Sequence, residues 1–284
     1  MPVVVLITND SMHGRRVLQS VWERGIVLDA VLYLTGGLGL PAARGAGLAG
    51  RLRRWPSAAA GTVGRRIRFA TARRRRYAER CARVIATGAM NSERLLRDLR
   101  QLRPDWIVLG GGGILAPQVI ATARLGVLNA HPALLPWIRG CGTTGASLAH
   151  GVALGATVHR VDAGIDTGPI VQRRLLPVAP GDTHLGDLEQ ACMRLASEML
   201  ADAVESVVRG GGVPAGVPQP GRYPLFRAAG EAELREHFAI AASGRAHALY
   251  TAWSTLCNAG EDGILPPFPF DAPTTVNLEP LVGS

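Results

Sequence analysis

Apolar and polar residues follow one another along the first half of the chain in blocks that predict alternating strands and helices. Apolar runs rich in β-branched residues predict buried strands at residues 3–8, 28–34, 83–86, 104–110 and 125–128. Apolar positions at helical spacing predict helices at residues 15–24, at 95–102 behind the polar cap Asn91-Ser92-Glu93, and at 117–124. This β-α-β order implies a parallel sheet whose crossovers are right-handed.

The second half of the chain continues this order for one more helix and then becomes irregular. Two further strands are predicted at residues 155–161 and 169–171. A long amphipathic helix follows at residues 185–204, with Asp182 or Thr183 as its expected cap and three glycines, 210–212, after its end. Beyond that point glycine and proline are frequent, and only residues 231–256 have a helical pattern.

Polar side chains at the ends of the predicted strands are the candidate chemistry of the chain. Asn129 and His131 follow the apolar run 125–128, and because residues two apart on a strand share a face, their amide and imidazole project side by side. Asp166 lies in a glycine-containing loop between the last two predicted strands. An amide, an imidazole and a carboxylate together can polarise an acyl carbonyl and move a proton. The pattern therefore indicates acyl-transfer chemistry.

The ends of the predicted parallel strands are expected to meet. In open α/β sheets, ligands bind in the crevice outside the carboxyl ends of the strands. The turn that begins at Asn9, residues 110–115, and the pair Asn129 and His131 all lie at such ends. We therefore expect them to line one site.

Length and composition indicate a globular protein. The 284 residues can bury one substantial core, and a composition of 47% hydrophobic and 19% charged residues indicates a globular rather than a disordered chain. No apolar stretch approaches the ~18 residues of a membrane span, and the start lacks a charged leader, so a cytoplasmic protein without a membrane partner is expected. The cysteines are far apart, without a Cys-x-x-Cys pair, which argues against a zinc site or a disulfide framework.

The formal net charge is +9, and all of the Lys and Arg positions are arginine. Complete replacement of lysine indicates a compositional bias, so the overall charge is not taken as a sign of nucleic-acid binding. Arginines do cluster between residues 51 and 76, where glycine and alanine are also frequent. This stretch could grip an RNA backbone or an anionic small substrate, but its composition favours a solvated loop.

Three segments carry a resemblance to a known family. Residues 129–136 match the pattern Asn-x-His-x-Ser-Leu-Leu-Pro, except that Ala133 replaces the serine. Thr157-Val-His159 precedes an Asp-x-Gly-x-Ile motif at residues 166–170, and Gly181-Asp-Thr183 stands before the long helix. In this order and spacing they resemble the formyltetrahydrofolate-dependent formyltransferases, which include glycinamide ribonucleotide, methionyl-tRNA and sugar-nucleotide formyltransferases. The resemblance covers residues 83–209 well and the first strand and turn loosely.

This resemblance implies a Rossmann-like α/β fold of three layers with a mostly parallel central sheet. It also implies a formyltransferase catalytic domain at residues 1–212, with an arginine-rich insertion or loop at 36–80, and a short, partly helical C-terminal extension at 213–284. Methionyl-tRNA formyltransferases carry a sizeable barrel after the catalytic domain, whereas this extension has few strand signals. We therefore expect neither a tRNA acceptor nor another nucleic-acid partner.

By the same resemblance, an amine attacks the formyl carbon of N10-formyltetrahydrofolate, and negative charge grows on the formyl oxygen. Asn129 would donate a hydrogen bond to that oxygen. His131 would donate to the same oxygen or carry the proton that the amine loses. Asp166 would orient His131 and favour its protonated form, because a nearby negative charge stabilises a cation. No metal is implied.

Further residues are expected around these three. The pterin of the co-substrate would be held by main-chain groups of Gly113, Ile114, Leu115, Val161, Asp162, Ala163 and Gly164. Asn9 and Ser11 occupy the turn in which relatives bind the acceptor's phosphate, although a plain strand-to-helix turn explains them more simply. His159 either lines the site or is a satisfied core histidine, and the sequence leaves both open. Residues 110–113 complete no G-x-G-x-x-G fingerprint, so dinucleotide binding is not expected.

We therefore expect an N-formyltransferase that acts on the amine of a small metabolite, an amino sugar or a specialised-metabolite precursor. One alternative is a formyltetrahydrofolate hydrolase, in which the same residues direct water at the formyl group. Another is a methionyl-tRNA formyltransferase-like or RNA-binding protein on this scaffold. The sequence does not identify the acceptor amine, and a homodimer is compatible with it although nothing in it fixes the oligomeric state.

Overall fold

The computed structural model describes residues 1–36, 77–111, 113–219 and 223–257, so most of the arginine-rich stretch lies outside the described residues. Its strands are β1 (Val4–Thr8), β2 (Ala30–Leu34), β3 (Val84–Thr87), β4 (Trp106–Gly110), β5 (Gly126–His131), β6 (Arg139–Gly140), β7 (Gly155–Arg160), β8 (Ile170–Leu175) and β9 (Leu225–Phe226). Its helices are α1 (Met12–Glu23), α3 (Glu93–Leu102), α4 (Pro117–Ile120), α5 (Thr143–Ala149), α6 (Leu185–Val208), α7 (Glu231–Ala242) and α8 (Arg245–Leu256).

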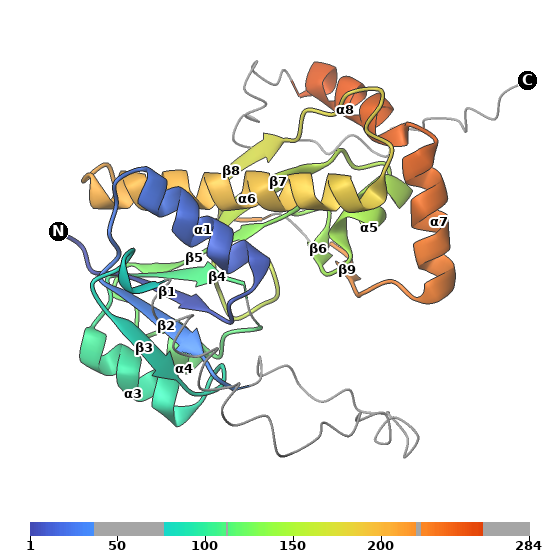
Figure 1. Cartoon of the computed structure of the whole chain (residues 1–284). Helices are drawn as coiled ribbons and strands as arrows, with labels where there is room; N and C mark the ends of the chain where they lie inside the picture. Colours follow the sequence, from blue (N-terminus) through green and yellow to red (C-terminus); the bar gives the residue numbers. More distant parts are fainter. Residues whose placement is uncertain (37–76, 112, 220–222, 258–284) are drawn as a thin grey trace, which may run out of the picture.

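The main sheet joins seven strands in the order β3-β2-β1-β4-β5-β7-β8. The pairs from β3 to β5 are parallel, whereas β7 is antiparallel to both β5 and β8. Figure 1 shows α1 and α6 over one face of this sheet, with α3 and α4 on the other. The mostly parallel, three-layer α/β fold predicted from the sequence is confirmed.

The alternation of side chains along β5 decides which face of the sheet carries the candidate site. Leu128 and Ala130 are buried in the hydrophobic cluster that also contains residues of α1 and α6. Val127 points to the opposite face and is buried with the apolar side of α3. Asn129 and His131 follow Val127 at intervals of two, and therefore lie on the face covered by α3 and α4.

The first helix begins earlier than its hydrophobic pattern predicted. Ser11 caps α1, because its Oγ accepts a hydrogen bond from Gly14 N at 3.1 Å. Gly14 was expected in the preceding turn but lies in the helix, where a Cβ atom would come within 2.2 Å of Gly110 O. The absence of a side chain lets α1 lie directly against the end of β4.

The expected cap of the long helix was wrong. α6 is capped by neither Asp182 nor Thr183: its N-cap is His184, whose side chain makes no capping bond. The Asp182 carboxylate instead accepts a hydrogen bond from Ala179 N at 2.8 Å, within the turn before the helix. The helical pattern predicted at residues 231–256 is confirmed, and it forms two helices, α7 and α8, because Gly244 has a φ of +79° between them.

The described part of the C-terminal extension shares a hydrophobic core with the α/β fold. Trp253 of α8 is buried, its Nε1 donates to Gly151 O at 3.1 Å, and its ring meets Trp137 edge-on with the ring centroids 5.0 Å apart. β9, in the extension, also pairs in parallel with β6. The end of the catalytic domain at residue 212 stays a prediction. Among the described helices, none has the length and apolar character that a membrane crossing requires.

Candidate active site

Two neighbouring antiparallel strands carry three of the predicted site residues. In the register of β5 and β7, Asn129 lies opposite His159, and His131 lies opposite Thr157. Opposed residues point to the same face of a sheet, so all four side chains share the face covered by α3 and α4. Thr157 is buried there and holds the chain that leaves β5, because its hydroxyl donates to Ala133 O at 2.7 Å. The structure thus brings Asn129, His131 and His159 together, while their roles stay a prediction.

Asp166 lies between two imidazole rings. Its Oδ2 is 3.6 Å from His131 Nδ1, and its Oδ1 is 3.7 Å from His159 Nε2. Oδ2 also accepts a hydrogen bond from Gly140 N at 2.9 Å. Asp166 has a φ of +53°, in the left-handed region, which aspartate adopts more readily than most residues other than glycine. The hydrogen bond from Gly140 N helps to keep its carboxylate in place.

Both ring nitrogens of His131 face oxygen atoms. Nε2 lies 2.9 Å from Ile138 O and therefore donates its hydrogen to that carbonyl. Nδ1 faces the Asp166 carboxylate at a distance longer than a hydrogen bond. Catalytic hydrogen bonds are often long in ligand-free enzymes, so this distance leaves the pair a candidate. Nδ1 is the nitrogen through which His131 can exchange a proton with a ligand.

His159 is a neutral ring with its hydrogen on Nδ1. This nitrogen donates to Arg160 O at 3.0 Å, and Nε2 accepts from Asn129 Nδ2 at 3.1 Å. Burial lowers the pKa of His159 to about 4, although the negative charge of Asp166 acts in the opposite direction. The neutral ring therefore fixes the amide of Asn129 and leaves the second N–H of that amide for a ligand.

Replacing His159 by glutamine is expected to make the stability of the protein less sensitive to acid. The folded ring binds its proton near pH 4, whereas the unfolded chain does so near 6.5. Between these values the unfolded state binds more protons, so each unit of acidification favours unfolding by up to about 1.4 kcal/mol through this residue. The contribution is complete above pH 6.5 and declines as pH falls toward 4. Denaturant unfolding of His159→Gln across this range is expected to show a shallower slope.

The control for this measurement is the exposed His184. A His184→Gln variant is expected to keep the slope of the wild-type protein, because its ring is 70% exposed and only pairs with Asp187 at the surface. A slope for His159→Gln equal to that of the wild type would mean that the buried ring already carries a proton.

The first segment expected to hold the pterin is held by the Asn91 side chain. The Asn91 side chain donates to Ile114 O at 2.8 Å and accepts from Ala116 N at 2.8 Å. The Leu115 side chain is buried, so what this segment can offer a ligand is main chain. Gly113 stands next to residue 112, which lies outside the described residues.

The second segment is shaped by its own aspartate. The Asp162 carboxylate accepts from Gly164 N at 3.1 Å and from the Thr167 hydroxyl at 2.6 Å. The amide of Gly164 is therefore occupied, whereas Ala163 is exposed and Val161 packs against the apolar cluster that contains Leu115. Both segments thus lie beside one apolar cluster, and the groups they can present to a ligand are main-chain groups. This arrangement fits a flat ring that is bound by backbone hydrogen bonds.

The turn between β1 and α1 is closed by its own side chains. Asn9 Oδ1 accepts from Ser11 N at 3.2 Å, and Ser11 Oγ donates to Gly110 O at 3.1 Å. Asp10, with a φ of +61°, is buried between them and accepts a hydrogen bond from the Tyr77 hydroxyl. The Asp10 carboxylate also pairs with Arg15, whose Nη1 lies 4.0 Å from Oδ2. The polar groups of the turn thus bond one another, and the roles of Asn9 and Ser11 stay a prediction.

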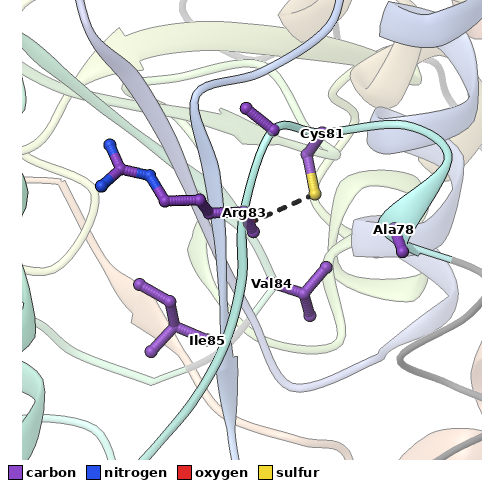
Figure 2. Close-up of a pocket in the computed structure, with 6 residues that line it drawn as sticks. Ala78, Cys81, Arg83, Val84 and Ile85 are labelled. Atoms are coloured by element: carbon purple, nitrogen blue, oxygen red, sulfur yellow. Dashed lines mark hydrogen bonds between the residues drawn. The ribbon is translucent and has the colours of Figure 1, made fainter.

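Away from these segments, the described residues offer little further chemistry. A hollow beside the edge strand β3, shown in Figure 2, is lined by residues 78 and 81–85 and contains none of the predicted site residues. Burial raises the pKa of the Cys81 thiol in its wall, which makes this thiol a poor nucleophile. Within the described ranges, no group of three or more His, Cys, Asp or Glu side chains is arranged to hold a metal ion.

The part of the chain that carries this polar cluster matches a known protein family. The sequence model of the family described as formyl transferase matches residues 57–204, just over half of the chain. The chain belongs to the formyl transferase family. The matched residues include Asn129, His131, His159 and Asp166, so the cluster lies inside the part shared with the family.

Curated members of the formyl transferase family resemble the same part of the chain. A methionyl-tRNA formyltransferase of Roseiflexus sp. (strain RS-1) is 33% identical over 139 residues, which are 48% of this chain and 41% of that protein. One of Koribacter versatilis (strain Ellin345) is 38% identical over 131 residues, 45% of this chain and 41% of that protein. The chain therefore spans about two fifths of the length of these relatives.

Solved structures of formyl transferases share the fold. A sugar N-formyltransferase from a Shewanella species has a TM-score of 0.53 and 15% identity, with 84% of this chain and 87% of that chain covered. A 4-N formyltransferase from Francisella tularensis has a TM-score of 0.53 and 14% identity, with 86% and 87% covered. Glycinamide ribonucleotide transformylase 1 from Symbiobacterium toebii has a TM-score of 0.51 and 22% identity, with 74% and 89% covered. At these identities the likeness concerns the fold alone.

Three residues contact the site although nothing in the sequence pointed to them. Gly140 and Ile138 act through main-chain groups, which any residue type could supply, so no motif announces them. Gln219 acts through its side chain, whose Nε2 donates to Asp166 O at 2.9 Å. Its one sequence signal is a polar residue within a stretch rich in proline and glycine, which is too common to single it out.

Proposed function

We propose that this protein is a cytoplasmic N-formyltransferase that moves the formyl group of N10-formyltetrahydrofolate to the amine of a small metabolite. One observation carries the proposal: Asp166 lies between His131 and His159, and His159 fixes the amide of Asn129 beside them. Membership of the formyl transferase family gives this cluster its reaction class. The same side chains in an unrelated fold would be only a polar cluster.

Each side chain of the cluster has one task in this reaction. The amine nitrogen forms a bond to the formyl carbon of the donor, and the bond between that carbon and N10 then breaks, which releases tetrahydrofolate. Asn129 donates its free N–H to the formyl oxygen as negative charge grows there. His131 exchanges the proton of the amine through Nδ1, and Asp166 stabilises the positive charge that the ring then carries. His159 remains neutral and orients Asn129.

A small acceptor is supported by one observation. A sugar N-formyltransferase and a 4-N formyltransferase of known structure resemble this chain over 84% and 86% of its length, which includes part of the C-terminal extension. The curated relatives are named for methionyl-tRNA, but they are matched over about two fifths of their length, so the tRNA acceptor is kept as an arm of the test.

The proposal is tested by incubating the purified protein with N10-formyltetrahydrofolate and a panel of amines, with products read by mass spectrometry. We expect at least one amino sugar or other small amine to gain a formyl group as tetrahydrofolate is released. Initiator methionyl-tRNA and a reaction without acceptor are run in parallel. Formate released in proportion to tetrahydrofolate without any acceptor would indicate a hydrolase, and formylation confined to the tRNA would overturn the small-metabolite acceptor.

A further inference from the structure

Gln219 is bound to the loop that carries Asp166. Its single amide nitrogen donates two hydrogen bonds, to Asp166 O at 2.9 Å and to Gly168 O at 2.7 Å. Gln219 lies beyond residue 204, where the match to the family model ends. The contact therefore joins the C-terminal extension to a candidate catalytic residue.

The segment that brings Gln219 to the loop is itself held at several points. Val217 and Ile170 exchange two main-chain hydrogen bonds of 2.8 Å, which tie the segment to the start of β8. The Arg160 guanidinium at the end of β7 donates to the carbonyls of Val213 and Pro214, each at 3.2 Å. Residues 213–219 thus cross the base of the β7–β8 loop, anchored to both strands that the loop connects.

The carboxylate and the main chain of Asp166 are fixed separately. Gly140 N holds Oδ2 at 2.9 Å, whereas Gln219 holds the carbonyl of the same residue. The second contact fixes the backbone of Asp166 in its left-handed conformation, with a φ of +53°, which is less populated than the extended and helical regions. A rotation of the Asp166 backbone would swing the carboxylate away from His131 and His159, which it now faces at 3.6 and 3.7 Å.

We propose that Gln219 is a positioning residue for formyl transfer, which sets the backbone of Asp166 and thereby holds its carboxylate between the two histidines. This inference rests on the proposed function. Gln219 touches no reacting atom: it acts through Asp166, so its loss lowers the rate of the chemical step and leaves substrate affinity in place. The C-terminal extension then completes the active site instead of merely covering the fold.

The test replaces Gln219 by methionine, which keeps the length of the side chain and removes both N–H donors. Turnover is followed as tetrahydrofolate release, whatever the acceptor. We expect kcat to fall about tenfold, because small displacements of catalytic groups slow the chemical step. KM for donor and acceptor is expected to stay near the wild-type value. Gln219→Glu, which has the same shape without the amide hydrogens, is expected to lose at least as much. Gln101→Met, at an exposed position on α3, is the matched control and keeps full activity.

A double-mutant cycle separates positioning from general stability. In an Asp166→Asn background, Gln219→Met is expected to change kcat little, because there is no longer a carboxylate to position. An equal fall in both backgrounds, or a rise in KM with kcat unchanged, would overturn the proposal. The imidazole ¹⁵N shifts of His131 and His159 give a readout without turnover. We expect Gln219→Met to move them in the folded protein, and unchanged shifts would overturn the proposal even if the wild-type protein transferred no formyl group at all.

Discussion

An Asn129→Ala variant is expected to transfer formyl groups about 10²–10³ times more slowly than the wild-type protein, the usual effect of losing one donor to a developing oxyanion. One hydrogen of the Asn129 amide is committed to His159 Nε2 at 3.1 Å, so the other is the one that can meet the formyl oxygen. Because this bond strengthens as charge develops, the loss is expected in kcat. Steady-state kinetics with N10-formyltetrahydrofolate and the best acceptor from the screen measure it.

Two companion variants make this result specific. Asn129→Asp keeps the shape of the side chain and places negative charge where the formyl oxygen becomes negative, so it is expected to be at least as slow as alanine. Gln118→Ala removes another amide from an exposed position on α4 and is expected to behave as the wild type. Near-normal turnover by a folded Asn129→Ala protein would take Asn129 out of the reaction.

The parts of the site that could be predicted are those that local pattern determines. Asn129 and His131 share a face because they are two apart on one strand, and that spacing is visible in the sequence. Asp166 could be paired with them because the residues around it resemble a family motif. The order of apolar runs likewise predicted every strand from β1 to β5, because buried strands of a parallel sheet are continuously apolar.

The parts that could not be predicted depend on how distant segments meet. The contact between Asn129 and His159 follows from the register of β5 against β7, and a shift of one residue would have turned His159 into the opposite core. Ile138 and Gln219 reach the site through the paths of two loops, which proline and glycine make irregular. The prediction of the α6 cap was wrong for a related reason: the Asp182 carboxylate, which was expected to cap the helix, instead accepts a hydrogen bond within the turn before it.

His131→Ala is expected to lower formyl transfer by about 10²–10⁴-fold, the range found when a positioned acid–base group is removed. The ring donates through Nε2 to Ile138 O at 2.9 Å, which leaves Nδ1, beside Asp166, as the nitrogen that handles the proton of the amine. Since alanine also removes the partner of a buried carbonyl, folding is checked by thermal melting. His150→Ala, at an exposed position beyond α5, is the control and is expected to be active. Unchanged function in His131→Ala would favour a binding protein on this scaffold over an enzyme.

An Asp166→Asn variant tests whether Asp166 and His131 act together in the reaction or separately. Asparagine keeps an oxygen that can accept from Gly140 N but removes the charge that faces His131. Alone it is expected to slow the reaction at least ~10²-fold, because the ring loses the charge that stabilises its protonated form. Combined with His131→Ala, it is expected to add little, since groups that act as a unit have effects far from additive. Losses that multiply in the double variant would instead mean that the carboxylate acts on the substrates without the imidazole, and the mechanism would have to assign Asp166 a contact of its own.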